Sequence, residues 1–175
     1  MPTCRQRPIA PSQLIDHDWV DTLRSALQMY RLPPEQLQIE ITESASAEGA
    51  QVEQLLRRIS ALGVRIALDD FGTGYSSLSE LHRLPIDVVK IDQSFVAELP
   101  ENVLGVQLLN AIVSMAHGLG HEVIVEGVET EAQRQLLAQI GCDAMQGYLF
   151  ARPLPESELR AALVAADRRA RAAGG

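Results

Sequence analysis

Apolar and polar residues follow two periods along the chain, and segments of one period alternate with segments of the other. One-by-one alternation indicates strands, because successive side chains of a strand point to opposite faces of a sheet. Strands are predicted over residues 37–42, 64–69, 87–92 and 122–126, and a short strand with a turn over residues 144–147. Apolar residues that recur every three or four positions indicate amphipathic helices. These are predicted over residues 16–30, 48–62, 76–84, 102–119 and 130–140, with a further Ala-rich helix from residue 155.

The repeated order of strand and then helix predicts an α/β protein with parallel strands, because connections of this length favour right-handed crossovers. Polar residues gather at or just beyond the carboxyl ends of the predicted strands. They are Glu40, Asp69, Asp70, Lys90, Glu126, Glu129 and Gln146. In a (β/α)₈ barrel these strand ends form the catalytic face. The pattern therefore predicts a parallel sheet or barrel with one polar site at this edge.

Two adjacent carboxylates, Asp69 and Asp70, end the strand at 64–69 and precede a loop with Gly72 and Gly74. The alternation places Asp69 on the inward face of the sheet. Neighbouring carboxylates repel each other unless a cation lies between them, so Mg²⁺ or Mn²⁺ is the expected partner. The alternative interpretation is an Asp-rich turn that only caps the following helix.

Composition narrows the class of protein. With 175 residues, of which 46% are hydrophobic, the chain is expected to form one domain with a substantial core. Its net charge of -8 argues against a nucleic-acid partner. All but one of the fifteen basic residues are arginine, and the exception, Lys90, lies on the inward face of a predicted strand. Cys4 and Cys142 lie far apart, which favours reduced thiols over a disulfide.

No segment of the sequence has the pattern of a membrane span or a leader. The longest apolar stretch, residues 103–120, contains Gln107, Asn110 and His117 and is predicted to be a core helix. We expect His117 to be a helix-surface or satisfied core residue and not a metal ligand. Residues 1–13 lack the apolar run of a signal peptide, so a cytoplasmic location is expected.

Five short motifs occur in the order of the EAL family of bacterial cyclic di-GMP phosphodiesterases. They are Ile-Glu-Ile-Thr-Glu-Ser at 39–44, Asp-Asp-Phe-Gly-Thr-Gly-Tyr-Ser-Ser-Leu at 69–78, Lys-Ile-Asp at 90–92, Glu-Gly-Val-Glu-Thr at 126–130 and Gln-Gly-Tyr at 146–148. The chain therefore resembles an EAL domain over about residues 8–159, with residues 160–175 as a C-terminal helix and tail. Residues 1–175 are interpreted as a single truncated EAL domain.

The resemblance implies hydrolysis of one phosphodiester of cyclic di-GMP, giving pGpG, at a site with two Mg²⁺ or Mn²⁺ ions. It implies that Glu40 and Asp69 ligate metal and that Asp70 holds the second ion. Lys90 would orient the attacking water or the phosphate. Glu126 would be both a metal-site carboxylate and the candidate general base.

Three further residues would support this site in the same resemblance. Glu129 and Gln146 would complete the surroundings of the water and the metal, and Glu43 would brace the loop after Asp70. The residues that bind the rest of the substrate are not assigned.

The sequence also departs from the family pattern. It does not contain the Glu-Ala-Leu motif, with its metal-binding glutamate and phosphate-binding arginine, which should precede Pro8 by several dozen residues. Pro8 itself aligns with a metal-binding asparagine, and Arg152 stands where lysine is usual. The resemblance thus implies an incomplete (β/α)₈ TIM-like barrel that lacks its first two strands. Exposed edges, which invite self-association, are expected at residues 37–42 and 144–146.

Two functions remain open at this point. The first is a phosphodiesterase whose activity is impaired by N-terminal truncation. The second is a catalytically inactive EAL remnant that binds cyclic di-GMP or a protein. An unrelated metal-dependent barrel enzyme has little support. The expected partners are cyclic di-GMP and either a second copy or an N-terminal regulatory domain, with no nucleic acid and no membrane segment.

Overall fold

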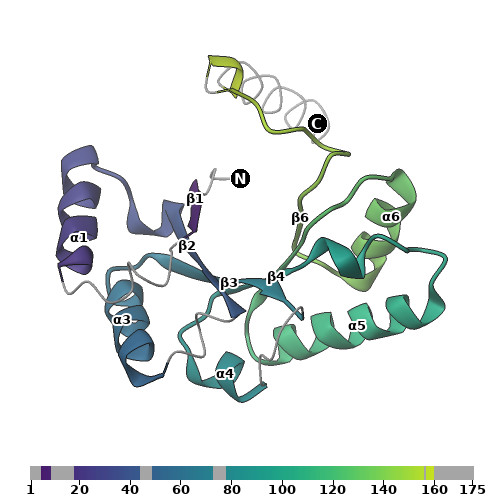
Figure 1. Cartoon of the computed structure of the whole chain (residues 1–175), viewed down its shortest axis with the longest axis horizontal. Helices are drawn as coiled ribbons and strands as arrows, with labels where there is room; N and C mark the ends of the chain where they lie inside the picture. Colours follow the sequence, from purple (N-terminus) through teal and green to yellow (C-terminus); the bar gives the residue numbers. More distant parts are fainter. Residues whose placement is uncertain (1–4, 9–17, 44–48, 73–77, 156, 160–175) are drawn as a thin grey trace, which may run out of the picture.

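A computed structural model describes residues 5–8, 18–43, 49–72, 78–155 and 157–159. Within these residues one parallel sheet contains six strands in chain order. The strands are β1 (Arg5–Pro8), β2 (Leu37–Thr42), β3 (Arg65–Phe71), β4 (Val88–Ile91), β5 (Glu122–Val125) and β6 (Ala144–Met145). They form a curved row that is open between β1 and β6 (Figure 1). The α/β prediction with parallel strands is confirmed.

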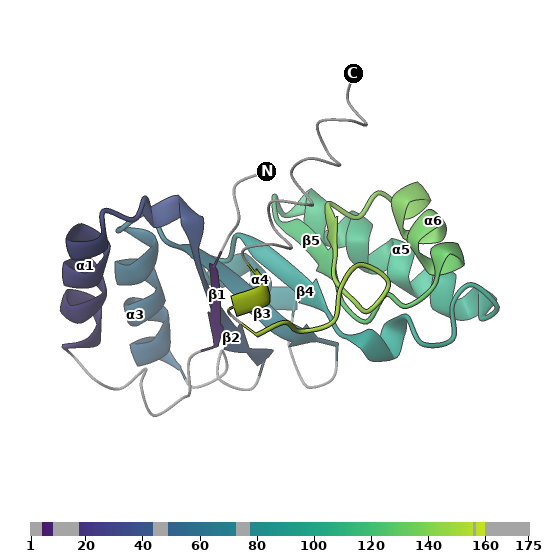
Figure 2. The same ribbon diagram turned by 90° about the horizontal axis from the view of Figure 1, so that it is seen from above.

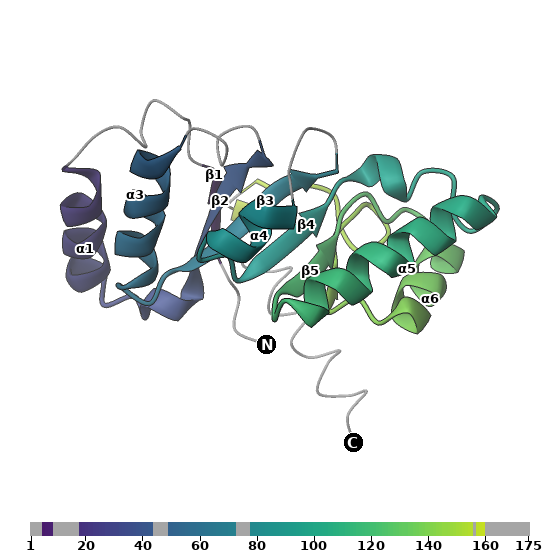
Figure 3. The same ribbon diagram turned by 90° about the horizontal axis from the view of Figure 1, so that it is seen from below.

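The helices lie along the outer side of the curved row of strands (Figure 1). They are α1 (Trp19–Tyr30), α3 (Ala50–Ser60), α4 (Leu78–Arg83), α5 (Val103–Gly118) and α6 (Glu131–Ile140), with 3₁₀ turns η2 (Pro34–Gln36) and η3 (Gln93–Phe95). Seen from above and from below, α1 and α3 lie together at one end and α5 and α6 at the other (Figures 2 and 3). Within the described residues, no helix is long and apolar enough to span a membrane.

Strand alternation separates an apolar face of the sheet from a polar one. Ile39 and Ile41 of β2 belong to the hydrophobic core, together with Leu56 and Ile59 of α3. Other strand residues of this core are Ile66, Leu68, Val89, Ile91, Val123 and Val125. The residues between them on the strands face the other way, and several of these are polar although they are buried. They include Gln38, Glu40 and Lys90.

The strand at the start of the sheet corrects one prediction. We expected residues 37–42 to be an exposed edge, but β1 pairs with β2 in parallel, with Arg7 opposite Ile39 and Pro8 opposite Glu40. Proline has no N–H to donate, and it is tolerated on an edge strand because one side of that strand needs no partner. The edges of the described sheet are therefore β1 and β6.

The end of β3 also differs from the prediction. The strand runs on to Phe71, and its register with β4 shifts between Leu68 and Phe71. Asp70, inside this irregular stretch, has a positive φ of 56°. An irregularity of this kind can redirect side chains at a strand end. The last helix, expected from residue 155, is seen as helical backbone at residues 157–159, and residues 160–175 lie outside the described part.

Candidate active site

Three carboxylates from three strands converge on Lys90. The Nζ atom of Lys90 lies 2.9 Å from Glu40 Oε1, 2.8 Å from Asp69 Oδ1 and 2.7 Å from Glu126 Oε1. Glu40 is in β2, Asp69 is near the end of β3, and Glu126 directly follows β5. Because the strands are parallel, their carboxyl ends meet at one edge of the sheet. The four side chains form what we call the Lys90 cluster.

Burial and charge make this cluster unusual. The Lys90 side chain is 5% exposed, and that of Glu40 is 8% exposed. Burial alone would lower the pKa of Lys90, but its contacts with Asp69, Glu126 and Glu40 raise that pKa well above the ordinary value. Lys90 is therefore a permanent cation at neutral pH. One ammonium faces three acidic side chains, and this imbalance favours a further cation.

Asp70, near the end of β3, and Glu43, which directly follows β2, flank the cluster. Asp70 is exposed, and its pKa is raised by partial burial and by the charges of Asp69 and Asp92, against the opposing effect of Lys90. The buried Glu43 accepts a hydrogen bond from the Gly72 N–H at 3.1 Å, through Oε2. Glu43 thus contacts the loop for which the sequence predicted a brace.

Glu129 and Gln146 lie near the same strand ends but are exposed. The Glu129 N–H donates to Gln133 Oε1 at 2.9 Å. Backbone bonds hold Gln146 on both sides, since its N–H donates to Val125 O and its carbonyl accepts from the Val128 N–H. These bonds fix the backbone of both residues near the strand ends, and the supporting roles of their side chains stay predictions.

The donor chemistry of the Lys90 cluster fits a hard divalent cation. Glu40 Oε1 and Asp69 Oδ1 are buried and accept no directed hydrogen bond within the described residues, although Lys90 Nζ is within ion-pair distance. Carboxylate oxygens are the ligands that Mg²⁺ and Mn²⁺ prefer. In the described part of the chain, no three His, Cys, Asp or Glu side chains are arranged to hold an ion by themselves. The carboxylates are instead closed around the ammonium of Lys90.

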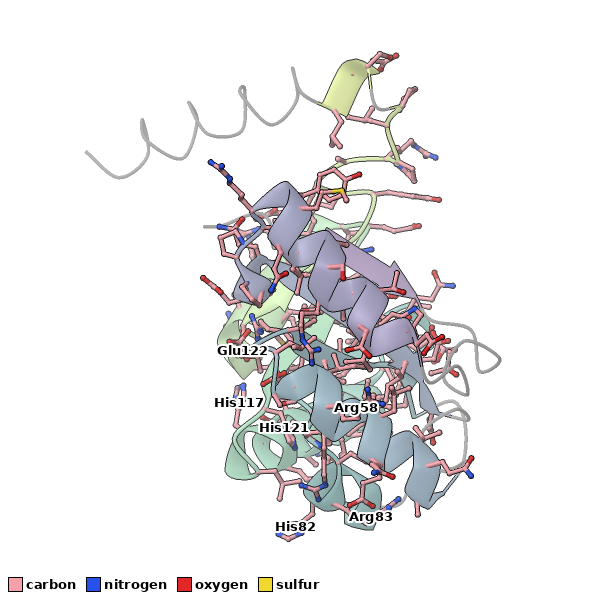
Figure 4. All side chains as sticks on the ribbon, turned by 90° about the vertical axis from the view of Figure 1, so that its left-hand side faces the viewer. Arg58, His82, Arg83, His117, His121 and Glu122 are labelled. Atoms are coloured by element: carbon pink, nitrogen blue, oxygen red, sulfur yellow. The ribbon has the colours of Figure 1, made fainter. Side chains whose placement is uncertain are left out.

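His117 and His121 lie away from this cluster. His121 immediately precedes β5, whereas Glu126 follows that strand, so the two residues are at opposite ends of it. Figure 4 shows His117 and His121 near the Glu122 that begins β5, and His121 N–H donates to Ala116 O. His117 is exposed and pairs with Asp143 at 2.8 Å. The expectation that His117 is a helix-surface residue is confirmed.

Sequence reasoning missed the residues that pack against the segments after Asp70 and after Glu126. Phe95 and Gln93, both in η3, face Gly72 and Gly127, which follow the carboxylate positions of β3 and β5. Glycines at these two positions were the available signal, because a missing Cβ often marks a close approach of another segment.

Parallel strands covered by helices on one face, with acidic residues at the strand carboxyl ends, define an α/β domain of the TIM-barrel-like class. The family model described as "EAL domain" matches residues 7–153. The chain belongs to the EAL domain family.

A curated relative is the bifunctional diguanylate cyclase/cyclic di-GMP phosphodiesterase MucR of Pseudomonas aeruginosa, which is 43% identical over 145 residues. That alignment covers 82% of this chain and 21% of MucR, so the chain spans about a fifth of the relative's length.

Solved structures of this family are also similar to the chain. The PaMucR phosphodiesterase in complex with c-di-GMP is 40% identical, with a TM-score of 0.82 over 88% of this chain and 69% of that one. The EAL domain of Mycobacterium smegmatis DcpA is 36% identical, with a TM-score of 0.87 over 92% of this chain and 73% of that one.

Proposed function

We propose that this chain carries the C-terminal part of a cyclic di-GMP phosphodiesterase site. The reaction would be metal-dependent hydrolysis of one phosphodiester of cyclic di-GMP to pGpG. The observation that carries the proposal is the convergence of Glu40, Asp69 and Glu126 on Lys90 at the strand carboxyl ends. Membership in the EAL family, with relatives named as cyclic di-GMP phosphodiesterases, supports the substrate class.

The proposed roles follow from the donor atoms. Glu40, Asp69 and Glu126 would hold Mg²⁺ or Mn²⁺, and Asp70 would hold a second ion. When bound, such ions lower the pKa of water and neutralise the phosphate. Glu126 would accept the proton of the attacking water. Lys90, which keeps its charge, would orient the water or a phosphate oxygen.

We also propose that the curved sheet is an incomplete (β/α)₈ barrel without its first two strands. Its open arrangement between β1 and β6 supports this reading. The Glu-Ala-Leu motif is not among the 175 residues, so the ligands that the family places there would have to be added. Losing one transition-state contact typically lowers the rate by about a hundredfold or more. These residues alone should therefore hydrolyse cyclic di-GMP weakly or not at all.

A second function is a binding module for cyclic di-GMP or for a protein. The observation that favours it is the closure of the three carboxylates around Lys90. A partner that covers the open edges would be a second copy or an N-terminal regulatory domain.

The experiment is a pGpG assay with Mn²⁺ on the purified chain, alone and mixed with a Glu-Ala-Leu fragment from a complete relative. We expect little product from the chain alone and clear turnover in the mixture. Glu126→Gln should abolish that turnover. Glu122→Gln, at the other end of β5, is the matched control and should leave most of it.

Each outcome selects one function. Turnover in the mixture that requires Glu126 establishes the phosphodiesterase site. Binding of cyclic di-GMP by calorimetry without turnover in any mixture establishes the binding module. Robust turnover by the chain alone contradicts the proposed impairment. The oligomeric state by analytical ultracentrifugation tests self-association in the same samples.

A further inference from the structure

The 3₁₀ turn η3 packs against the loop that follows the two aspartates. A Cβ atom on Gly72 would lie 2.5 Å from Cζ of Phe95, which is closer than side-chain carbons approach one another. The φ angle of Gly72 is 94°, so its backbone also favours glycine. Phe95 therefore packs directly on the backbone at Gly72, two residues after Asp70.

The same turn packs against the loop that follows β5. A Cβ on Gly127 would overlap Cβ of Gln93 and would lie 3.0 Å from the Gln93 Cα. Gly127 also has a positive φ, of 72°. Gln93 thus packs on the backbone of the residue next to Glu126. Two loops that are 55 positions apart in the sequence meet the two ends of one three-residue turn.

The turn itself is held in place from both ends. Asp92 Oδ1 accepts a hydrogen bond from the Ser94 N–H at 2.9 Å. Val96 is fully buried, and its carbonyl accepts from Gln133 Nε2 at 3.0 Å. Gln133 Oε1 in turn accepts from the Thr130 N–H at 2.9 Å. These bonds tie η3 to the start of α6 and leave it little freedom to move.

We propose that η3 is a positioning element for the acidic site, with Phe95 as a positioning residue for Asp69 and Asp70 and Gln93 as one for Glu126. Gly72 is held from two directions, by the Glu43 carboxylate on its N–H and by the Phe95 ring on its Cα. The orientation of the carboxylates then depends on a turn that carries none of them. The link to catalysis rests on the function proposed above, whereas the link to loop order does not.

Truncating Phe95 tests the contact with Gly72. Phe95→Ala should free the loop, so that the Gly72 amide exchanges its hydrogen faster in hydrogen–deuterium exchange. Residues that orient metal ligands typically change metal affinity by roughly 10–100-fold when they are mutated. We therefore expect Mn²⁺ binding, measured by calorimetry, to weaken by about tenfold. Phe95→Leu keeps an apolar side chain at the contact and should give a smaller but measurable change in both properties.

Leu62→Ala is the matched control. Leu62 is also partly buried against the hydrophobic core. It lies between α3 and the start of β3, however, whereas Gly72 follows the end of that strand. This variant should lower the melting temperature about as much as Phe95→Ala, without altering Gly72 exchange or Mn²⁺ affinity. Equal Gly72 exchange in Phe95→Ala and the wild type overturns the proposal. The proposal is also overturned if Phe95→Ala and Leu62→Ala change Gly72 exchange and Mn²⁺ affinity by equal amounts.

The exchange measurement separates this proposal from the proposed function. Faster Gly72 exchange in a chain that binds no Mn²⁺ at all supports the positioning role and contradicts the metal site. If Phe95→Ala does not fold, Phe95→Leu decides, because the smaller loss of contact should still give a measurable increase in Gly72 exchange.

Discussion

Lys90 Nζ lies 2.7 Å from Glu126 Oε1, and the same ammonium also contacts a carboxylate from each of the two strands before it. A single cation thus contacts side chains from β2, β3 and the end of β5. The prediction from alternation was that Lys90 would lie beside the acidic residues. The structure places it between them, and this has consequences for stability.

Lys90→Met should destabilise the metal-free chain. The variant leaves Glu40, Asp69 and Glu126 without their common partner, and breaking a buried pair in this way typically costs about 3–5 kcal/mol. The free energy of unfolding in urea measures this loss. Mn²⁺ should recover part of it, because a divalent ion can replace the missing positive charge.

The control for this variant is Arg24→Ala, which breaks an exposed pair with Asp21. Exposed pairs contribute only about 0–1 kcal/mol, so little change is expected. A Lys90→Met chain as stable as the wild type in the absence of metal would contradict the role given to the ammonium.

Gly147→Ala should destabilise the chain by about 1–3 kcal/mol, as overpacking does. An added Cβ would overlap the backbone of Val128 and would lie 2.7 Å from its carbonyl carbon, and backbone cannot move aside as a side chain can. Gly118→Ala is the matched control, because no atom lies within 4 Å of its added Cβ at the end of α5. That change should stabilise the chain by about 0.4–1 kcal/mol in urea unfolding. Equal effects of the two substitutions would refute the contact.

Asp143→Asn should remove the part of the folding stability that comes from the ionised Asp143 carboxylate and that is lost on acidification. Burial alone would raise the pKa of Asp143, but the Val123 N–H and the His117 ring lower it. A carboxyl group whose pKa is lowered in the folded state stabilises the fold at pH values above its unfolded pKa of about 3.9. That contribution is lost as the pH falls through the pKa of the folded state.

The variant should therefore be less stable than the wild type at pH 7, by less than about 1 kcal/mol for so exposed a group. The difference should shrink below about pH 4. Urea unfolding at pH 7 and pH 3 measures it, with Asp21→Asn as an exposed control. A difference that grows on acidification would have the wrong sign for this mechanism.

The Cys142 thiol should react slowly in the native chain. Burial and the charge of Asp143 raise the pKa of Cys142 to about 11. At pH 8 only roughly one thiol in a thousand would be the reactive thiolate. In a Cys4→Ser background, labelling with a disulfide reagent should be much slower than for the urea-unfolded chain. Adding Asp143→Asn should speed it, and native labelling at the unfolded rate would contradict the prediction.

The sequence alone was enough to predict which residues share a face of the sheet. Side chains alternate along a strand with a period of two, so Glu40 and Lys90 had to lie opposite the apolar face that Ile39 and Ile41 form. The order of strands and helices likewise predicted parallel pairing. Local helix signals also held, since Gly141 ends α6 in the left-handed conformation.

Tertiary structure decided which segments meet. The pairing of β1 with β2 depends on the chain returning to the sheet edge, and no local pattern in Arg5–Pro8 predicts that. The place of Lys90 between three carboxylates depends on strand register and sheet curvature. The contacts of η3 with Gly72 and Gly127 join parts of the chain far apart in sequence. Periodicity reports the direction of a side chain from its own backbone, whereas these contacts arise only when separate segments are packed together.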